Sequence, residues 1–424
     1  MYKKLFSLLA VLAIASSANA DLIAYYDFDN PSGYHVLNQG TAGTVPSSTG
    51  VLMNGAQIVD IDTTSRGMEG VLQLNNTTGS SLADCQYMNI TNGDDTWYDD
   101  AMPYGVGARS YAAWIRMEPD TTQQFRMIMS KGYETTLNLG VGELGTAGYE
   151  YLFFSYHAGI ASWSPLKSAV DAISDEYWHH VVATIDGADY KTASLYINGV
   201  LQESLQSWQP LYQNNLDLLI GAEPNRTAYN YGWNGMIDDV RIYDEHLDER
   251  DVYILWLNTY TEFYGGSILT LPSLDSVEIA GPEEVGEGSQ EQYTATACIN
   301  SVMQPDCNYL DVTDYVSWRL EPETNADIDE NGLLTVGDIN AVESITLYAE
   351  CTIGGVTKVG ELAVDLCGSA DLNDDCKLDL NDYAILASQW LEAHGVLSAD
   401  IAPPPGGDGI VDVNDLGMLV EGWP

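Results

Sequence analysis

Short runs in which apolar and polar residues alternate dominate the chain from residue 21 to residue 263. Clusters of Gly, Asn, Asp and Ser separate these runs, and a period of two is typical of strands with one buried face. We therefore expect a mainly β protein with an antiparallel sandwich over residues 21–263. The clearest predicted strands are 110–117, 127–131, 151–156, 179–186 and 193–198.

One predicted hairpin has a defined turn. The segment 194–203 carries Asn198-Gly199 at its centre, between two runs of β-forming residues. Asn and Gly tolerate the positive φ angles of the type I′ turn that joins two-residue hairpins. We expect the flanking runs to pair as neighbouring strands.

A Gly-rich linker, 264–274, precedes a second set of strand-like runs over residues 275–367. Turn residues occur at Asn331-Gly332 and Gly354-Gly355, and the region has a single tryptophan, Trp318. A length of roughly 90 residues fits a small immunoglobulin-like sandwich. We expect Trp318 to anchor its core, and we find no catalytic set of residues in it.

The first 20 residues predict a secretory signal peptide. Lys3 and Lys4 precede an apolar run, 5–15, and Ala18-Asn19-Ala20 is a small-residue cleavage site. The run is short for a transmembrane helix, and no Cys follows it to carry a lipid. We expect a secreted chain that starts at Asp21 and has no transmembrane segment.

Charge narrows the range of partners. The chain has 62 acidic and 15 basic side chains and a net charge of -47, while 45% of its residues are hydrophobic. Nucleic acids and anionic membranes require a basic patch, so neither is an expected partner. The acidity reflects few Lys and Arg residues in a globular composition, not a disordered acidic tail.

The six cysteines of an exported chain can form disulfides, but their spacing does not select one pairing. Cys85 stands alone, and a free buried thiol is an alternative for it. We expect bridges among the closely spaced cysteines, and Cys367 and Cys376 could pair across a domain junction. That close set is Cys298, Cys307, Cys351, Cys367 and Cys376.

Six segments, in order, resemble the motifs of laminin-G-like domains, which have a concanavalin A-type jelly roll. They are 24–29, 111–116, 128–132, 178–184, 195–200 and 234–243. The resemblance implies a two-sheet jelly roll that binds glycans or proteins, although the same fold also hosts glucanases. More loosely, the middle region resembles bacterial group 2 immunoglobulin-like domains, which implies a spacer. The segments that carry this second resemblance are 279–282, 293–297, 311–318 and 328–335.

The clearest cation chemistry lies in the acidic segment Asp371–Asp382. Its oxygen-bearing side chains fall at positions 1, 3, 5, 9 and 12, with a backbone carbonyl at position 7. Ca²⁺ prefers six to eight oxygen ligands arranged in this way. The predicted ligands are Asp371, Asn373, Asp375, Lys377, Asp379 and Asp382.

The pattern recurs 33 residues later, where Asp379, Asp382, Leu386 and Trp390 match Asp412, Asp415, Leu419 and Trp423. A duplicated loop and helix resembles a dockerin domain, here over residues 369–424. The resemblance implies calcium as cofactor and a cohesin-bearing scaffold protein as partner, contacted at the helix starts. The second predicted ligand set is Asp400, Asp408, Ile410, Asp412 and Asp415, and the predicted cohesin contacts are Leu380, Asn381, Val413 and Asn414.

Three features depart from the calcium-loop pattern. Position 6 of the first loop, usually Gly, is Cys376, which strains a left-handed backbone. In the second loop Asp400 lies eight residues before Asp408 instead of four, so the insertion 403–407 must bulge. Both loops end in Asp rather than a longer Glu. A solvated acidic surface is the alternative, but eleven acidic residues against Lys377 alone in 368–424 would repel one another without a cation.

A second cation site is predicted in the jelly roll. Asp27 and Asp29 share one face of the first strand, and Asp238 or Asp239 lies near the last. An ion pair with Arg241 is the competing explanation.

Aromatic residues between strands suggest sugar stacking, with an ordinary core role as the alternative. The predicted carbohydrate-binding residues are Trp97, Tyr104, Trp163, Tyr229 and Tyr231.

No catalytic residue is predicted. A jelly-roll glucanase typically carries Glu-x-Asp-x-x-Glu on one strand, and the nearest segment, Glu118-Pro119-Asp120, lacks the last acid. His179 and His180 are adjacent on a predicted strand, so their rings face opposite sides. We therefore expect a non-catalytic carbohydrate- or surface-binding protein in a polysaccharide-degrading or cell-surface assembly. A glycoside hydrolase with carboxylates on separate strands is the alternative.

Overall fold

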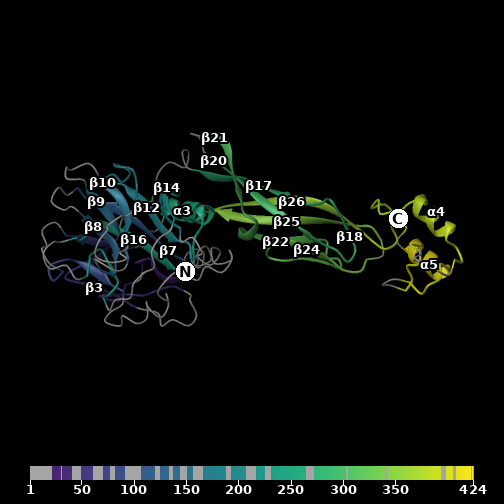
Figure 1. Ribbon diagram of the computed structural model, residues 1–424, viewed down its shortest axis with the longest axis horizontal. Helices are drawn as coiled ribbons and strands as arrows, with labels where there is room; N and C mark the ends of the chain where they lie inside the picture. The colour runs from purple at the N-terminus through teal and green to yellow at the C-terminus, as the bar shows by residue number, and fades with distance from the viewer. Residues whose placement is uncertain are drawn as a thin grey trace. The chain divides into compact units, whose positions relative to one another are not determined.

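The computed structural model divides into two compact units, Met1–Ser267 and Ile268–Pro424, which we describe separately (Figure 1). It describes residues 22–29, 31–40, 49–60, 70–76, 82–90, 107–119, 125–132, 137–143, 150–155, 166–187, 192–206, 216–224, 231–263, 272–301, 304–339, 341–392, 398–403, 407–421 and 423. The predicted signal peptide lies outside these residues. No helix in the described ranges combines the length and the apolar character needed to cross a membrane.

The first unit contains two antiparallel sheets of eight strands each, as the alternating pattern predicts. In the first sheet the order is β14-β13-β12-β7-β16-β5-β4, and β1 also pairs with β16. Its strands are β1 (Leu22–Tyr26), β4 (Gln57–Val59), β5 (Val71–Asn75), β7 (Arg109–Met117), β12 (Trp178–Ile185), β13 (Ala193–Ile197), β14 (Val200–Leu205) and β16 (Asn234–Tyr243).

The second sheet has the order β11-β10-β9-β8-β15-β6-β3-β2. Its strands are β2 (His35–Val36), β3 (Gly50–Met53), β6 (Tyr87–Asn89), β8 (Phe125–Ser130), β9 (Asn138–Glu143), β10 (Glu150–Ser155), β11 (Leu166–Lys167) and β15 (Leu219–Ile220). The five strands predicted from the sequence all occur, with ends within two residues of the predicted ones. The predicted hairpin joins β13 to β14, with positive φ angles of 51° at Asn198 and 75° at Gly199.

The main core lies between the two sheets and follows strict alternation. Tyr111, Ala113 and Ile115 of β7 point into it, as do Leu152 and Phe154 of β10. Residues between them face away from the core, because successive side chains of a strand point to opposite faces. Several of these outward residues of β7 and β10 are apolar and buried as well, so both strands also pack on their outer faces.

Helix α3 (Glu249–Phe263) covers the outer face of the first sheet. Its residues Val252 and Leu255 pack against Val182 and Tyr196 of β12 and β13. The sequence interpretation placed only strands before residue 263, so this helix is a correction. Among its buried residues, positions 252, 255, 256 and 259 have the spacing of a helical stripe, not of a strand, and Ile254 and Leu257 are buried as well.

The second unit begins with a β region, residues 273–367, built from three sheets. The first of these sheets contains β17 (Ser273–Ala280), β20 (Thr294–Ser301) and β21 (Gln304–Asp311). The second contains β18 (Glu284–Gly286), β26 (Val356–Cys367), β25 (Glu343–Ile353) and β22 (Val316–Glu321). The third contains β19 (Gln290–Gln292), β24 (Leu333–Val336) and β23 (Ala326–Ile328). A 3-10 turn, Thr313–Tyr315, precedes β22. Because β17 starts at Ser273, the last two residues of the predicted linker belong to a strand. Trp318 is partly buried against the core of this region, as expected.

Two disulfides are present. Cys298–Cys307 joins β20 to β21, and Cys367–Cys376 joins the end of β26 to the following acidic segment. The predicted pairing across the junction is therefore confirmed, and the free-thiol alternative holds for Cys85. Cys351 departs from the expected bridging of its close set, because it is a buried free thiol. Burial raises the pKa of Cys85 to about 11 and that of Cys351 to about 12, which keeps both thiols neutral.

Candidate functional site

Two loop-helix units form the C-terminal module, residues 369–424. Helix α4 (Leu380–Ser388) and helix α5 (Val413–Glu421) have nine residues each and begin 33 positions apart. Each starts with an aspartate that caps it: Asp379 accepts a hydrogen bond from the Asn381 amide at 2.7 Å, and Asp412 accepts one from the Asn414 amide at 2.8 Å. The repeat predicted from the sequence is thus a structural repeat in which both helices are capped in the same way.

In the first loop two buried carboxylates organise the backbone. Asp371 accepts hydrogen bonds from the amides of Asp375, at 3.2 Å, and Cys376, at 2.6 Å. Asp382 is fully buried and accepts from the amides of Leu372, at 2.8 Å, and Asp379, at 2.7 Å. The carboxylates of the first and last predicted ligands therefore hold the backbone of this loop in place.

The second loop repeats these contacts despite its insertion. Asp400 accepts from the amides of Asp408, at 2.9 Å, and Gly409, at 2.7 Å. Asp415 is fully buried and accepts from the Ile401 amide at 2.7 Å, as well as from the Ala402 and Asp412 amides at 2.8 and 2.7 Å. Asp400 thus occupies the place of Asp371, as the predicted bulge requires.

The middle positions of the loops also match. Asp375 accepts from the amide of Lys377 and Asp408 from the amide of Ile410, both at 3.1 Å. In the first loop the exposed Asn373 side chain donates to Asp375 at 2.8 Å. Lys377 and Ile410, whose carbonyls are predicted ligands, therefore donate equivalent amide hydrogen bonds in the two repeats.

The ligand types suit a hard cation, but among the described residues no three of the predicted carboxylates of either loop have oxygens within 4.8 Å of one another. Burial raises the pKa of Asp371, the hydrogen bonds from the Cys376 and Asp375 amides lower it in part, and repulsion from Asp382 and Asp375 raises it again, so the net shift is upward. All predicted ligands are oxygens, which calcium prefers. Cys367 and Cys376 lie beside Asp371, but their sulfurs are joined in the disulfide and are not available as thiolate ligands.

The helices pack through a small core and expose their starts. Leu386, Ala399, Val411 and Leu419 are buried together, and Ile385 packs against them. The two matching tryptophans contribute less to this packing, because Trp390 and Trp423 are 40% and 39% exposed. The four predicted partner contacts are all at the surface: Leu380 and Val413 are 73% and 67% exposed, and Asn381 and Asn414 are exposed too.

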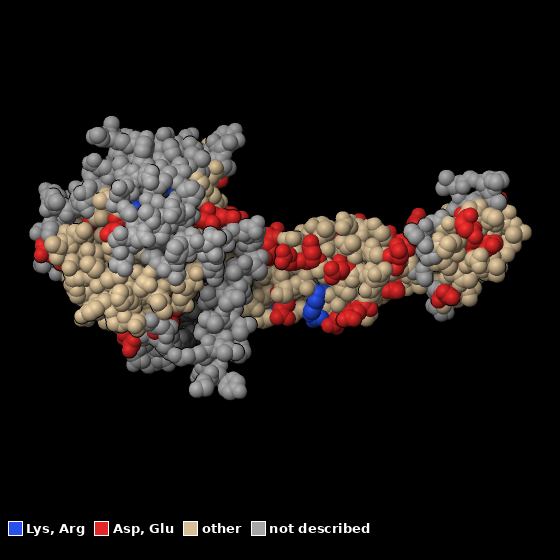
Figure 2. All heavy atoms as spheres, turned by 90° about the horizontal axis from the view of Figure 1, so that it is seen from below, with Lys and Arg blue, Asp and Glu red and all other residues tan. Residues whose placement is uncertain are grey.

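Negative charge is widespread on the second unit. Figure 2 shows many Asp and Glu side chains and few Lys and Arg on its visible face. A partner for this surface must tolerate or complement negative charge.

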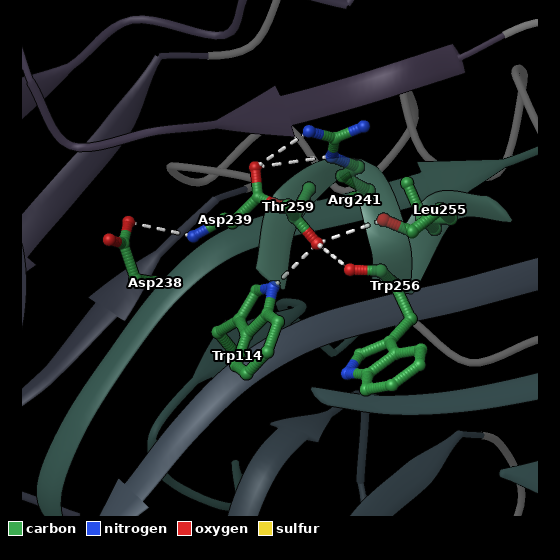
Figure 3. A network of polar contacts seen from close by, with 7 residues as sticks. All are labelled: Trp114, Asp238, Asp239, Arg241, Leu255, Trp256 and Thr259. Atoms are coloured by element: carbon green, nitrogen blue, oxygen red, sulfur yellow. Dashed lines mark hydrogen bonds and ion pairs between the residues drawn. The ribbon is translucent and has the colours of Figure 1, made fainter. Parts of the chain in front are cut away.

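In the jelly roll, Asp239 forms an ion pair with Arg241 at 2.9 Å (Figure 3). Both side chains are buried, and the guanidinium lies 4.5 Å from the ring centre of Tyr25. Asp238 accepts from the Asp239 amide at 2.7 Å. The ion-pair alternative is therefore observed for Asp239, which leaves Asp27 and the remaining acids as candidates for a cation.

The other two candidate acids are partly buried near the first strand. Burial raises the pKa of Asp27, and the Asp239 carboxylate also raises it. Asp27 accepts from the Asp29 amide at 3.2 Å, and Asp29 accepts from the Gly70 amide at 3.2 Å. These bonds hold the chain after β1, and they do not by themselves define a cation site.

An aromatic cluster lies on the outer face of the second sheet. Phe125 makes edge contacts with Phe153 at 5.7 Å and with Tyr231 at 5.3 Å between ring centres. Tyr151 and Phe153 alternate along β10 with core residues, so they face away from the main core. Of the predicted sugar contacts, only Tyr231 belongs to this cluster; Trp97, Tyr104, Trp163 and Tyr229 lie outside the described residues. Apolar residues at both alternate positions of β10 are the sequence signal for this second face.

The adjacent histidines have separate environments, as predicted. The Nε2 atom of His179 lies 3.2 Å from the Ser174 hydroxyl, whereas the His180 ring packs 5.2 Å from that of Trp114. Burial, with the positive charge of Arg241, lowers the pKa of His180 to about 3. His180 is therefore a neutral core residue at ordinary pH.

Residues 87–253 match the family model of the concanavalin A-like lectin/glucanases superfamily. The match covers most of the first unit and confirms the laminin-G-like resemblance over these residues. No curated protein matches the chain.

Solved structures with some likeness include domain 4 of AbnA, a GH43 extracellular arabinanase from Geobacillus stearothermophilus, in complex with arabinotriose. It is 18% identical, covers 56% of this chain and 99% of its own, and has a TM-score of 0.37. The binding domain of botulinum neurotoxin DC in complex with rat synaptotagmin II is 15% identical, covers 81% of this chain and 73% of its own, and has a TM-score of 0.42. Likeness at this level assigns no function to the chain.

The segment nearest to the glucanase motif is described only in part. Glu118, the residue after β7, lies 3.8 Å from Arg116 in an ion pair, and Asp120 of the same segment lies outside the described residues. The superfamily name covers both lectins and glucanases, so the match alone does not separate binding from cleavage.

Proposed function

We propose that the chain is a secreted, non-catalytic binding protein that attaches to a partner through a calcium-dependent dockerin-like module. The observation that carries the proposal is the repeated set of backbone bonds in the two acidic loops. Asp371 and Asp400 accept equivalent amides, as do Asp382 and Asp415, although the loops differ in length. That two loops of different length reach one arrangement supports the proposal of a common ligand.

Calcium would be held by oxygen ligands alone. Bound calcium would supply the positive charge that offsets the clustered carboxylates. Without it the aspartates repel one another, and a module this small has little core to compensate. The first set comprises Asp371, Asn373, Asp375, Asp379, Asp382 and the Lys377 carbonyl; the second comprises Asp400, Asp408, Asp412, Asp415 and the Ile410 carbonyl.

The exposed helix starts would contact a cohesin-bearing scaffold protein. Leu380 and Val413 are large apolar side chains at equivalent places of the repeat, and both are exposed. Each is followed by an exposed Asn that can hydrogen-bond to a partner. An apolar anchor beside a polar contact is a common arrangement in protein interfaces. The middle β region would act as an immunoglobulin-like spacer.

The concanavalin A-like domain would bind carbohydrate. The matched superfamily includes lectins, and Tyr231 with Phe125 forms a partly exposed aromatic edge beside the outer face of the second sheet. Aromatic rings of this kind can stack on sugar faces. Hydrolysis is the competing function, because the same superfamily includes glucanases.

Calcium binding is tested by titrating the full chain with calcium after EDTA treatment and following binding by calorimetry. We expect two C-terminal sites, and Asp379→Ala should remove the first while leaving the second. Circular dichroism should show helical signal lost with EDTA and β signal retained. An unchanged helical signal together with no heat of binding would refute the calcium claim.

Partner binding is tested with a panel of recombinant cohesins, with and without calcium. Leu380→Ala combined with Val413→Ala should abolish capture, whereas either change alone should weaken it less, because each repeat can present the face. Capture that is equal in the double variant would refute the proposed surface.

Ligand binding by residues 21–263 is tested on a glycan array and a polysaccharide panel. Retention on a polysaccharide without release of reducing sugar is expected. Release of reducing sugar that disappears when an acid of this domain is mutated would establish the hydrolase alternative. Mass spectrometry of the exported protein, with an N-terminus at Asp21, would test secretion.

A further inference from the structure

The two loops differ at their sixth position. Gly409 of the second loop has a φ of 93°, in the left-handed region that glycine adopts readily. Its counterpart, Cys376, has a φ of 55°, and a left-handed backbone is costly for a residue with a side chain. Cys376 therefore occupies a position where glycine is the easier residue.

The Cys376 sulfur is bonded to Cys367, the last residue of β26. That anchor is held in place by its neighbours: β26 pairs with β25 along its length, and Cys367 accepts a backbone hydrogen bond from Glu287 at 2.9 Å. The Ser369 amide, two residues further on, donates to the Ile339 carbonyl at 3.0 Å. The start of the first loop is thus tied to the β region both covalently and by hydrogen bonding.

The disulfide also encloses part of the predicted ligand set. It joins residues nine positions apart, and Asp371, Asn373 and Asp375 all lie within that ring. The amide of Cys376 is the 2.6 Å donor to the Asp371 carboxylate, so the position of Cys376 sets the orientation of the first ligand. The second loop has no cysteine and hence no equivalent link.

We propose that the Cys367–Cys376 disulfide positions the first loop for its cation, making the calcium affinity of that loop, and not of the second, depend on the covalent link to the β region. The inference rests on the proposed calcium function. A closed ring limits the conformations of the calcium-free loop, so less ordering accompanies binding. The left-handed residue Cys376 is the one that makes this link.

The test measures the two loops separately in the full chain by calcium calorimetry. In an Asp412→Ala background the first loop is reported, and in an Asp379→Ala background the second. Each background is combined with Cys367→Ser and Cys376→Ser. The matched control is Cys298→Ser with Cys307→Ser, which removes the disulfide that lies within one sheet of the β region.

We expect loss of the Cys367–Cys376 link to weaken calcium binding by the first loop about three- to tenfold. The second loop and the control variant should keep their affinities within about twofold, the reproducibility assumed for such titrations. A merely structural role would weaken both loops together, which would overturn the proposal.

A companion variant, Cys367→Ser with Cys376→Gly, removes the link and relieves the left-handed strain. It should bind calcium at the first loop more tightly than the double serine variant but less tightly than the native chain. Equal first-loop affinity in the native and double serine proteins would overturn the positioning role while leaving calcium binding intact. Absence of calcium binding in the native chain would instead overturn the proposed function and this inference together.

Discussion

Thr259 connects helix α3 to the first sheet, and its replacement tests how that layer is held. Its hydroxyl accepts a hydrogen bond from the indole nitrogen of Trp114 at 2.8 Å and lies 2.9 Å from the carbonyl oxygen of Leu255, to which it donates (Figure 3). Both Thr259 and Trp114 are buried. Thr259→Val keeps the volume but removes the acceptor, so the buried indole N–H loses this partner.

The expected cost is about 1–3 kcal/mol in the free energy of unfolding, the range for a buried donor deprived of its acceptor. The bond donated to Leu255 adds little, because it stays within one turn of the helix. Thr259→Ser is the matched control, since it retains the hydroxyl and loses only a methyl group. It should cost about 1 kcal/mol or less, the value for one buried methylene-sized group.

Urea unfolding of the full chain, followed by tryptophan fluorescence and near-UV circular dichroism, measures these differences in the first unit. A double-mutant cycle with Trp114→Phe isolates the pair, because a phenylalanine side chain has no donor. In that background Thr259→Val should cost less by about 1 kcal/mol, within the usual range for contacting residues. Equal unfolding midpoints for Thr259→Val and Thr259→Ser, or a cost of Thr259→Val that is unchanged by Trp114→Phe, would refute the assigned bond.

Three further predictions concern buried groups. His180 has a folded pKa of about 3, below its unfolded value of roughly 6.5, so between these two pH values the unfolded state binds more protons and stability falls as the pH drops. Urea unfolding at pH 7 and at pH 5 should therefore show that the stability of His180→Phe increases relative to the native chain at the lower pH. A stability difference that is the same at both pH values would contradict this. Asp415→Asn removes a buried carboxylate that accepts hydrogen bonds from three amides. It should lower the free energy of unfolding by about 1.5–3 kcal/mol per lost charged hydrogen bond. Circular dichroism should show reduced helicity for this variant, whereas the control Glu421→Gln, at an exposed position, should leave helicity unchanged. Leu419→Ala in the small core should cost about 2–5 kcal/mol, and similar melting of this variant and the exposed Val420→Ala would count against the packing.

The sandwich was predictable because short runs of β-forming residues are separated by turn residues. In β7 the residues Tyr111, Ala113 and Ile115 face the main core, but Ala112 and Trp114 of the opposite row are buried as well, so the run indicates a strand without selecting its inward face. Helix α3 was missed because the strand interpretation was extended to residue 263, although the charged segment 244–251 separates β16 from the stripe that includes Val252 and Leu255. There the helical spacing, and not the local residue types, carried the information.

The charged residues of β16 show a different limit of prediction from sequence. Asp239 and Arg241 are two positions apart, so period-two alternation puts them on one face and allows either an ion pair or a cation beside the acid. In the structure a bulge near Asp238 and a φ of 49° at Asp239 reorient the chain, and the carboxylate meets the guanidinium. Sequence spacing assumes a regular strand, and it cannot select between alternatives that depend on an irregular one.

The two acidic loops show why ligand spacing is a weaker guide than backbone hydrogen bonding. Asp371 lies four residues before Asp375, and Asp400 lies eight before Asp408, yet each first aspartate accepts the amides of positions 5 and 6 of its loop. The extra residues leave these bonds unchanged, so the carboxylate is placed by the amides it accepts and not by its distance along the chain. The repeats are nevertheless unequal, because the first is linked to the β region through Cys376 and the second is not. The two helix starts would present equivalent surfaces. A partner bound to the second repeat would then contact the repeat that no disulfide links to the β region. Binding through the two faces should then differ in its dependence on the disulfide, even where the contacting side chains are the same.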